Sequence, residues 1–244
     1  MKKLNIYFTA GIPNLEDTGK VAQLIQEAGA DRMEIGIPYS DPVADGPVIQ
    51  DAHSLALKNG MTIKKLFDQL AEIKDSVSIP KVLMGYFNPV LQFGFENFCK
   101  KCQEVGVSGL IIPDLPPIEF EKKYGEILNK YGLNFTFLIT PETSEERIRY
   151  LDSLSSGFLY AVSSSSTTGN EKAQLKNETY LNRIASLPLK NPVFIGFGIR
   201  DKEGFDSVTE KAQGGIIGTA FVKILLDHAD WQVKASDFIK GIKR

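Results

Sequence analysis

Residues 15–36 read LEDTGKVAQLIQEAGADRMEIG, and this stretch contains the structural unit that recurs along the chain. Apolar residues repeat at helical spacing over 15–28, Gly29 follows, and a short β-rich run occupies Arg32 to Gly36. A glycine after the last helical turn adopts the left-handed conformation that lets the chain turn back toward a sheet. The stretch therefore predicts a helix that leads through a glycine turn into a buried strand.

The same arrangement recurs, with Gly106, Gly132 and Gly214 each placed between a helical pattern and a β-rich run. Eight strands are predicted in all, at 4–9, 32–36, 81–85, 110–113, 134–139, 158–163, 193–196 and 215–218. Helical patterns alternate with them, at 15–28, 48–58, 63–74, 95–105, 118–131, 145–153, 178–186 and 203–212.

Strands that alternate with helices form a parallel sheet, because each right-handed crossover brings the chain back in the same direction. Eight such units in 244 residues fit a closed (β/α)₈ TIM barrel, whose usual length is about 250 residues. An open flavodoxin-like or Rossmann sheet with an appendage is the alternative. No linker interrupts the series, so the sequence predicts a single α/β domain over residues 1–244.

The composition is that of an ordinary globular protein and excludes several classes. Hydrophobic residues make up 43% and charged residues 24%, which excludes collagen-like, disordered and coiled-coil chains. The net charge is −2 without a basic block, so neither nucleic acid nor a membrane surface is an expected partner. Two cysteines, an early apolar run broken by Asn5, and no run of about twenty apolar residues favour a cytoplasmic protein without a secretory signal.

The second predicted strand carries a carboxyl group. Met33 and Ile35 share one face of this strand and Glu34 the other, because side chains alternate along a strand. If the apolar pair packs on the helices, Glu34 points into the barrel near the end where barrel active sites lie. A carboxylate buried there must be paired, protonated or used in catalysis. Glu34 is thus a candidate catalytic residue, and a structural ion pair with an inward-facing base is the alternative.

A loop rich in proline follows that strand, at residues 38–47 with the sequence PYSDPVADGP. Prolines restrict φ, and a rigid loop at this end of a barrel can position reactive groups. Two carboxyl groups in different surroundings can divide acid and base roles, as Glu34 and Asp45 would. For Asp41 and for Asp45 the alternative is a turn or a helix cap before Val48.

Two glycine loops follow the last two predicted strands. Residues 196–198 are Gly-Phe-Gly, and Gly218-Thr219 opens a helix. Barrels commonly bind phosphate between these loops, through backbone N–H groups and a helix N-terminus. Asp201 stands where a dinucleotide motif needs a third glycine, which argues against a Rossmann site. Tight turns without a ligand are the alternative for either loop.

Residues 163–172, SSSSTTGNEK, follow the sixth predicted strand at the same end of the barrel. This position predicts a lid that closes over the substrate and excludes water, with Thr168 and Gly169 near its phosphate end. A flexible linker is the alternative.

Other features favour structural roles. Cys99 and Cys102 lie within a helical pattern, and His53 and His228 show no ligand spacing, so no metal site is expected. Lys81 stands at a strand start, so the barrel centre lacks a lysine for Schiff-base chemistry. With metal and Schiff-base chemistry excluded, the sequence favours acid–base chemistry, carried out by carboxyl groups on a phosphorylated substrate.

Residues 34–47, EIGIPYSDPVADGP, resemble the signature of the tryptophan synthase alpha chain family. The resemblance covers nearly the whole chain and continues at 8–11, 83–89, 114–116, 168–169, 196–199 and 218–220. It implies a (β/α)₈ barrel that cleaves indole-3-glycerol phosphate to indole and glyceraldehyde 3-phosphate, in the last steps of tryptophan biosynthesis. It also implies no cofactor in this subunit and a β partner that carries pyridoxal phosphate, in an α₂β₂ heterotetramer.

The resemblance further implies roles for individual residues. Glu34 would protonate the indole ring carbon and accept the glycerol hydroxyl proton, while Asp45 would hold the indole N–H and stabilise the cationic intermediate. The bicyclic ring would lie among Tyr7, Tyr86, Ile111, Ile139, Tyr160 and Phe197. The phosphate would bind at Thr168, Gly169, Gly198, Gly218 and Thr219.

Two other functions stay open at this point. The chain could act mainly as a subunit that binds and activates a partner, or as another phosphosugar enzyme such as an isomerase or indole-glycerol-phosphate synthase. The latter would need a lysine or glutamate at other strand ends, whereas the sixth predicted strand ends in serines. Thr219 stands where the family more often has serine, and Ser164 and Ser166 also depart from its pattern.

Overall fold

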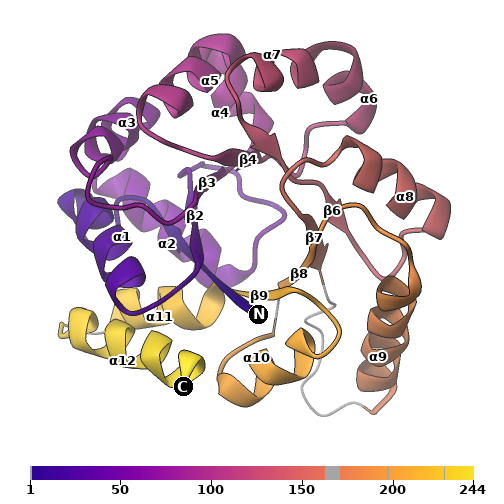
Figure 1. Cartoon of the computed structure of the whole chain (residues 1–244). Coiled ribbons are helices and arrows are strands. Elements are labelled where there is room, and N and C mark those ends of the chain that lie inside the picture. The colour runs from indigo at the N-terminus through magenta and orange to yellow at the C-terminus, as the bar shows by residue number, and fades with distance from the viewer. Residues whose placement is uncertain (1, 163–170, 197, 228) are drawn as a thin grey trace.

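The computed structural model describes residues 2–162, 171–196, 198–227 and 229–244, and its centre is a parallel β-sheet (Figure 1). Within these residues the sheet has nine strands: β1 Lys3–Thr9, β2 Arg32–Gly36, β3 Lys81–Met84, β4 Gly109–Ile111, β5 Asn134–Phe135, β6 Leu138–Ile139, β7 Leu159–Val162, β8 Val193–Gly196 and β9 Gly214–Ile217. Each strand pair is parallel.

The fifth predicted strand is interrupted, which is why nine strands occur where eight were predicted. β5 and β6 stand at opposite ends of the strand order β5-β4-β3-β2-β1-β9-β8-β7-β6, yet only Thr136 and Phe137 separate them along the chain. The Thr136 N–H donates to the Leu110 carbonyl at 3.1 Å, and the Tyr160 N–H donates to the Phe137 carbonyl at 3.0 Å. These two residues bridge the ends, so the sheet closes into the predicted (β/α)₈ barrel and the open-sheet alternative is wrong.

Helices surround the sheet in a ring (Figure 1). In chain order they are the 3₁₀ turn η1 Leu15–Asp17, α1 Thr18–Glu27, α2 Pro47–Lys58, α3 Ile63–Glu72, α4 Phe87–Phe93, α5 Phe95–Glu104, α6 Pro117–Glu119, the π-helical turn η2 Phe120–Tyr124, α7 Gly125–Lys130, α8 Glu145–Leu154, α9 Glu171–Ser186, α10 Lys202–Thr209, α11 Thr219–Asp227 and α12 Trp231–Lys243. Two of these, α4 and α12, were not predicted. The sequence at α4 contains Asn88-Pro89, which is typical of a turn, but proline is tolerated in a first helical turn.

Several helix starts follow from local sequence. Thr62, Ser144 and Asp201 precede α3, α8 and α10, and each side chain accepts a hydrogen bond from the backbone N–H three residues later. Such caps satisfy N–H groups that lack a partner in the first helical turn. Asp201, which stands where a dinucleotide motif needs glycine, is therefore the N-terminal cap of α10.

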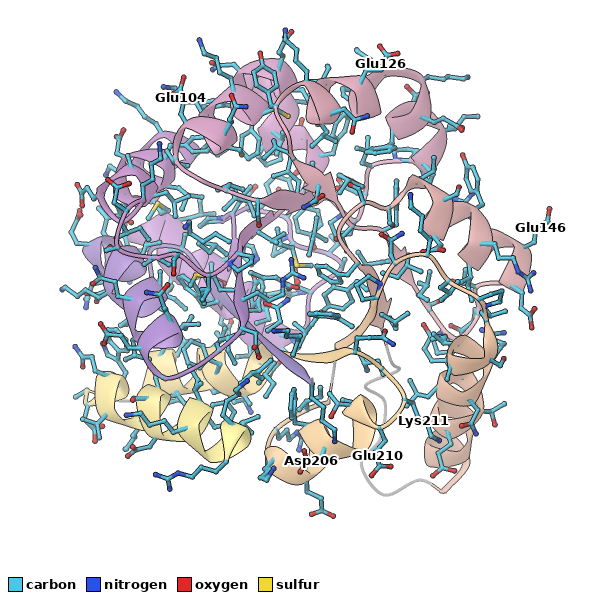
Figure 2. All side chains as sticks on the ribbon, viewed as in Figure 1. Glu104, Glu126, Glu146, Asp206, Glu210 and Lys211 are labelled. Atoms are coloured by element: carbon cyan, nitrogen blue, oxygen red, sulfur yellow. The ribbon has the colours of Figure 1, made fainter. Side chains whose placement is uncertain are left out.

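Side-chain alternation divides the apolar residues into two layers. Leu4, Ile6 and Phe8 of β1 are fully buried between the sheet and the helices. A second cluster, the inner cluster, consists of Val82, Ile111, Phe158, Tyr160, Phe194 and Ile216 from strands on both sides of the barrel. Charged side chains such as Glu104 and Glu126 lie on the outer edge of the helix ring, away from both layers (Figure 2).

Three of the four predicted glycine turns are confirmed. Gly29, Gly106 and Gly132 have φ angles of 97°, 73° and 65°, which place them in the left-handed region. The prediction for Gly214 is wrong, because this residue begins β9. A Cβ atom at Gly214 would lie 2.8 Å from the Lys3 carbonyl oxygen on the neighbouring β1, so close strand packing explains the glycine there.

The structural role predicted for the cysteines is confirmed, since Cys99 and Cys102 are free and buried on α5. Among the residues that the structure describes, no group of histidine, cysteine and acidic side chains is suited to hold a metal ion. None of the described helices combines the length and the apolar character needed to cross a bilayer.

Gly214→Ala tests the packing between β1 and β9. We expect the free energy of unfolding to fall by about 1–3 kcal/mol, because the new methyl group meets backbone and the Phe194 ring. Gly241→Ala is the matched control: Gly241 is exposed on α12 and an added Cβ there meets nothing within 4 Å, so we expect a gain of roughly 0.5–1 kcal/mol. Urea unfolding of both variants measures the two values, and equal stability of the two would contradict the close approach.

Candidate functional site

Glu34 points into the barrel, as its strand pattern predicts. Its neighbours Met33 and Ile35 are fully buried in the layer between sheet and helices, which sends the intervening side chain to the opposite face. None of the Glu34 surface is exposed. The carboxyl group therefore lies in the interior of the barrel.

The surroundings of Glu34 determine its protonation. The Asn5 amide Nδ2 donates to Glu34 Oε1 at 2.6 Å, and Glu34 Oε2 has no partner among the described residues. Burial raises the pKa of Glu34 from its usual 4.5 to about 8, against the opposing effects of the Arg32 charge and the Asn5 hydrogen bond. Arg32 makes no direct ion pair with Glu34 among the contacts of the described residues, so the ion-pair alternative does not hold. A carboxyl group with this pKa can act as acid and as base near neutrality.

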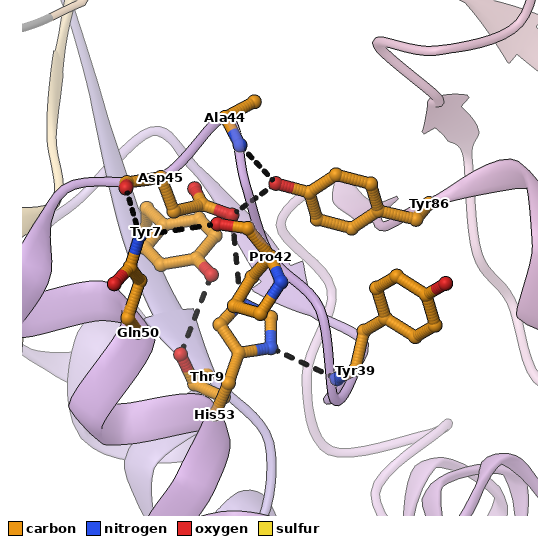
Figure 3. A network of polar contacts seen from close by, with 9 residues as sticks. All are labelled: Tyr7, Thr9, Tyr39, Pro42, Ala44, Asp45, Gln50, His53 and Tyr86. Atoms are coloured by element: carbon orange, nitrogen blue, oxygen red, sulfur yellow. Dashed lines mark hydrogen bonds and ion pairs between the residues drawn. The ribbon is translucent and has the colours of Figure 1, made fainter.

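Asp45 is held in the loop between β2 and α2 by a residue from the next strand end. The Tyr86 hydroxyl, which follows β3, donates to Asp45 Oδ2 at 2.7 Å and accepts from the Ala44 N–H at 3.0 Å (Figure 3). The Asp45 side chain is 18% exposed, and burial raises its pKa while the Tyr86 hydrogen bond lowers it. Asp45 therefore has a fixed position beside the barrel mouth, whereas Asp41 is exposed and its carbonyl accepts from Val43 N–H in a turn.

His53 lies beneath Asp45 (Figure 3), and no sequence pattern pointed to this contact. Its Nδ1 accepts from the Tyr39 N–H at 3.0 Å, and its Nε2 lies 3.8 Å from Asp45 Oδ2 (Figure 3). Burial lowers the pKa of His53 to about 4, so the ring is neutral at physiological pH. Because Nδ1 accepts, the ring proton is on Nε2 and faces the Asp45 carboxylate.

Two buried tyrosines, Tyr7 and Tyr160, lie near both carboxyl groups. Glu34 and Asp45 both act electrostatically on Tyr7 and on Tyr160, and burial raises the pKa of each phenol so that both stay neutral. The Tyr7 hydroxyl lies 3.3 Å from Thr9 Oγ1. A Cβ atom at Gly196 would collide with the Tyr160 hydroxyl, so glycine is required where this ring lies.

The predicted pocket residue Ile139 does not face this interior, which corrects the assignment. Ile139 packs with Phe135 and Phe137 between sheet and helices, whereas Leu138 packs against the inner cluster together with Ile111. The two phenylalanines occupy the outer face of the strand, and alternation sends Ile139 to the same side. Leu138 therefore takes the place predicted for Ile139.

The two glycine loops lie at the carboxyl ends of β8 and β9. Gly198 has a φ of 78°, and a Cβ atom at Gly218 would lie 3.4 Å from the Tyr7 ring. The side chain of Thr219 is exposed at the first residue of α11, where backbone N–H groups have no partner within the helix. The predicted residues Thr168, Gly169 and Phe197, most of the predicted lid and His228 lie outside the described residues.

Comparison with known proteins identifies similar chains. The model of the family described as "Tryptophan synthase alpha chain" matches residues 2–240. The tryptophan synthase alpha chain of Christiangramia forsetii is 52% identical over 99% of this chain and 94% of the relative. The solved subunit alpha of Legionella pneumophila tryptophan synthase has 33% identity and a TM-score of 0.88, covering 99% of this chain and 91% of that one. A chain of tryptophan synthase from M. tuberculosis has 27% identity and a TM-score of 0.87, with 99% and 91% covered.

Glu34→Gln tests the burial of this carboxyl group through stability. A pKa raised from 4.5 to about 8 means that the folded protein holds the proton more tightly than the unfolded chain. The contribution of Glu34 is therefore favourable below about pH 4.5 and is lost as the pH rises to about 8. We expect wild type and variant to unfold with similar free energy in acid, and the variant to become the more stable as the pH rises.

Urea unfolding at a series of pH values measures this difference. Glu126→Gln, on the exposed surface of α7, is the control for loss of a carboxyl group without burial. A difference between wild type and Glu34→Gln that stays constant across the pH range would contradict the raised pKa.

Proposed function

This chain belongs to the tryptophan synthase alpha chain family, and we propose that it cleaves indole-3-glycerol phosphate to indole and glyceraldehyde 3-phosphate with Glu34 and Asp45 as catalytic residues. Membership makes it an enzyme of tryptophan synthesis. The proposed reaction class is a carbon–carbon lyase. The proposed location is the cytoplasm, because both cysteines of the chain are free and buried, as in proteins of a reducing compartment. The observation that carries the proposal is the Glu34 carboxyl, fully buried yet with a pKa near neutrality.

Glu34 has the properties that a retro-aldol cleavage demands of one group. Its protonated carboxyl donates a proton to the indole ring carbon that carries the glycerol chain, and the ring becomes cationic. The resulting carboxylate then takes the proton of the adjacent glycerol hydroxyl. The carbon–carbon bond breaks, its electron pair returns to the indole ring, and the hydroxyl carbon becomes the aldehyde. Glu34 ends protonated, ready for the next turnover.

Asp45 stabilises the charge that develops during this step. Its carboxylate accepts a hydrogen bond from the indole N–H and lies opposite the positive charge of the protonated ring. The Tyr86 hydroxyl stabilises the ionised form of Asp45 and fixes its orientation. A fixed carboxylate in a partly buried site stabilises a developing positive charge more strongly than a carboxylate in water, because no solvent must reorganise as the charge forms.

The substrate would lie across the barrel mouth with its two ends in different surroundings. The indole ring packs against Tyr7, Tyr86, Ile111, Tyr160 and Leu138, with Phe197 as a further proposed contact. The phosphate binds at Gly198, Gly218 and Thr219, where the N-terminus of α11 presents backbone N–H donors, and at Thr168 and Gly169. Glu34 and Asp45 thus act on the carbon–carbon bond that lies between the apolar indole end and the anionic phosphate end of the substrate.

Exposed apolar side chains support a protein partner at the same end of the barrel. Val43, Leu91 and Ile118 are 86%, 44% and 53% exposed, and they follow the neighbouring strands β2, β3 and β4. Neighbouring strand ends bring these side chains to one face, which we call the docking face. Alpha chains work with a tryptophan synthase β chain, and the proposed assembly is α₂β₂ with pyridoxal phosphate held by the β chain.

Glu34→Gln and Asp45→Asn test the catalytic assignment. Each variant keeps the shape of the side chain, and each should lower the rate of indole release from indole-3-glycerol phosphate by about 10²-fold or more. Asp41→Asn is the matched control, because Asp41 is exposed in the same loop and should leave the rate near that of wild type. Full activity in both carboxyl variants would overturn the assignment.

Val43→Asp and Ile118→Asp test the docking face. A charge in the centre of an apolar interface should weaken the affinity for the β chain by about tenfold or more in a titration. Val233→Asp is the control, because Val233 is 63% exposed but lies on α12. If all three substitutions reduce affinity equally, or none does, the β chain binds elsewhere.

A further inference from the structure

Two polar side chains lie below Glu34 in the barrel, and the reaction described above assigns them no role. Arg32 precedes Glu34 by two residues on β2 and shares its inward face, and Asn5 on β1 is paired in register with Arg32. We call Asn5, Arg32 and Glu34 the basal polar cluster. Barrel interiors are mostly filled with branched apolar side chains, so three polar groups at adjacent inward positions call for an explanation.

The Arg32 guanidinium is held by two aromatic rings rather than by a carboxylate. Its Cζ atom lies 4.9 Å from the centre of the Phe158 ring and 5.3 Å from that of Phe194, both members of the inner cluster. These contacts fix a positive charge inside the barrel without neutralising it. Burial lowers the pKa of Arg32, but a guanidinium stays charged at any pH at which proteins work.

Asn5 contacts the Glu34 carboxyl directly. Its Nδ2 donates to Oε1 at 2.6 Å, while Asn5 Oδ1, Glu34 Oε2 and Arg32 Nε are buried without a hydrogen-bond partner among the described residues. Buried polar atoms without partners reduce stability, so the cluster is not explained by folding alone. An amide carries both a donor and an acceptor, so Asn5 can donate to an ionised carboxylate or accept from a protonated one.

We propose that Asn5 and Arg32 are positioning residues for the cleavage reaction: Asn5 holds the Glu34 carboxyl through its hydrogen bond, and the Arg32 charge two residues away on β2 helps to keep both the protonated and the ionised carboxyl accessible near neutral pH. This inference rests on the proposed function, in which Glu34 gives a proton and then takes one. A group that does both in one turnover must not be locked in either form.

The balance depends on the charged, titratable and hydrogen-bonding groups near Glu34 on β1, β2 and β7. Arg32 on β2 carries a charge, Tyr7 on β1 and Tyr160 on β7 stay neutral, and Asn5 donates a hydrogen bond. Burial alone favours the protonated carboxyl. The Arg32 charge and the Asn5 N–H favour the ionised one, so together they oppose the effect of burial.

Direct titration of the Glu34 carboxyl tests the proposal. Carbon-13 NMR of the full-length chain, with Glu34→Gln for assignment, gives the titration midpoint in wild type and in each variant. In Arg32→Met we expect the midpoint to rise by about one pH unit or more, because the positive charge is gone. Arg32→Lys, which keeps a positive charge, should stay close to wild type.

Two further variants distinguish the loss of a specific interaction with Glu34 from a general disturbance of the packing around it. Asn5→Leu should also raise the midpoint, through loss of the hydrogen bond. Phe194→Leu loosens the packing around Arg32 but keeps its charge, so it should leave the midpoint near wild type. An unmoved midpoint in folded Arg32→Met or Asn5→Leu overturns the inference and leaves the proposed function of Glu34 untouched.

The pH dependence of kcat for indole release then connects the cluster to catalysis. The reactive form of Glu34 at the first step is protonated, so kcat falls as the pH rises through its pKa. Removing the Arg32 charge should move this fall to higher pH by the same shift that NMR measures, with little change in KM. A moved NMR midpoint with an unmoved kcat profile would overturn the proposed role of Glu34, and with it the catalytic part of this inference.

Discussion

Every second side chain of β2 faces the barrel interior, and the chemistry of the site depends on that alternation. Met33 and Ile35 fill the space between the sheet and the helices, so Glu34 has no path to water on the outer side. The interior of the closed sheet surrounds the carboxyl, and none of the Glu34 surface is exposed. Burial of this kind disfavours the ionised form and brings the pKa of a carboxylic acid close to neutrality.

That burial is only partly compensated, and the remainder matters for function. The Asn5 amide and the Arg32 charge favour ionisation, and neither neutralises Glu34 fully. A direct ion pair with Arg32 would lock the carboxylate and remove the acid, whereas an entirely apolar interior would lock the acid and remove the base. The arrangement observed for Glu34 lies between these two extremes. It reduces the stability of the fold at high pH, but it leaves a carboxyl group that can both donate and accept a proton.

The two catalytic carboxyl groups reach the site by different structural routes. Glu34 belongs to a strand, so the barrel itself determines its position. Asp45 belongs to a loop, and its position depends on Tyr86 from the next strand end and on His53 from the following helix. Loop positions are usually less precise than strand positions. The hydrogen bonds of Tyr86 to both Ala44 and Asp45 compensate for this by tying the loop to β3.

The sequence by itself determined the properties that local backbone geometry controls. The alternation of strands and helices and the inward direction of Glu34 follow from side-chain periods of 3.6 and 2.0 residues, and the left-handed turn at Gly29 follows from the freedom of glycine at a helix end. The same reasoning, applied to Phe135 and Phe137, would have identified Leu138 in place of Ile139.

Only the tertiary structure decided the properties that depend on residues far apart along the chain. Closure of the barrel brings the Phe158 and Phe194 rings to Arg32, and the Lys3 carbonyl to Gly214. No local pattern encodes these contacts, because each pairs one element with another whose distance is set by the whole sheet. The pKa of Glu34 belongs to the same group, since burial and nearby charge are properties of the folded interior.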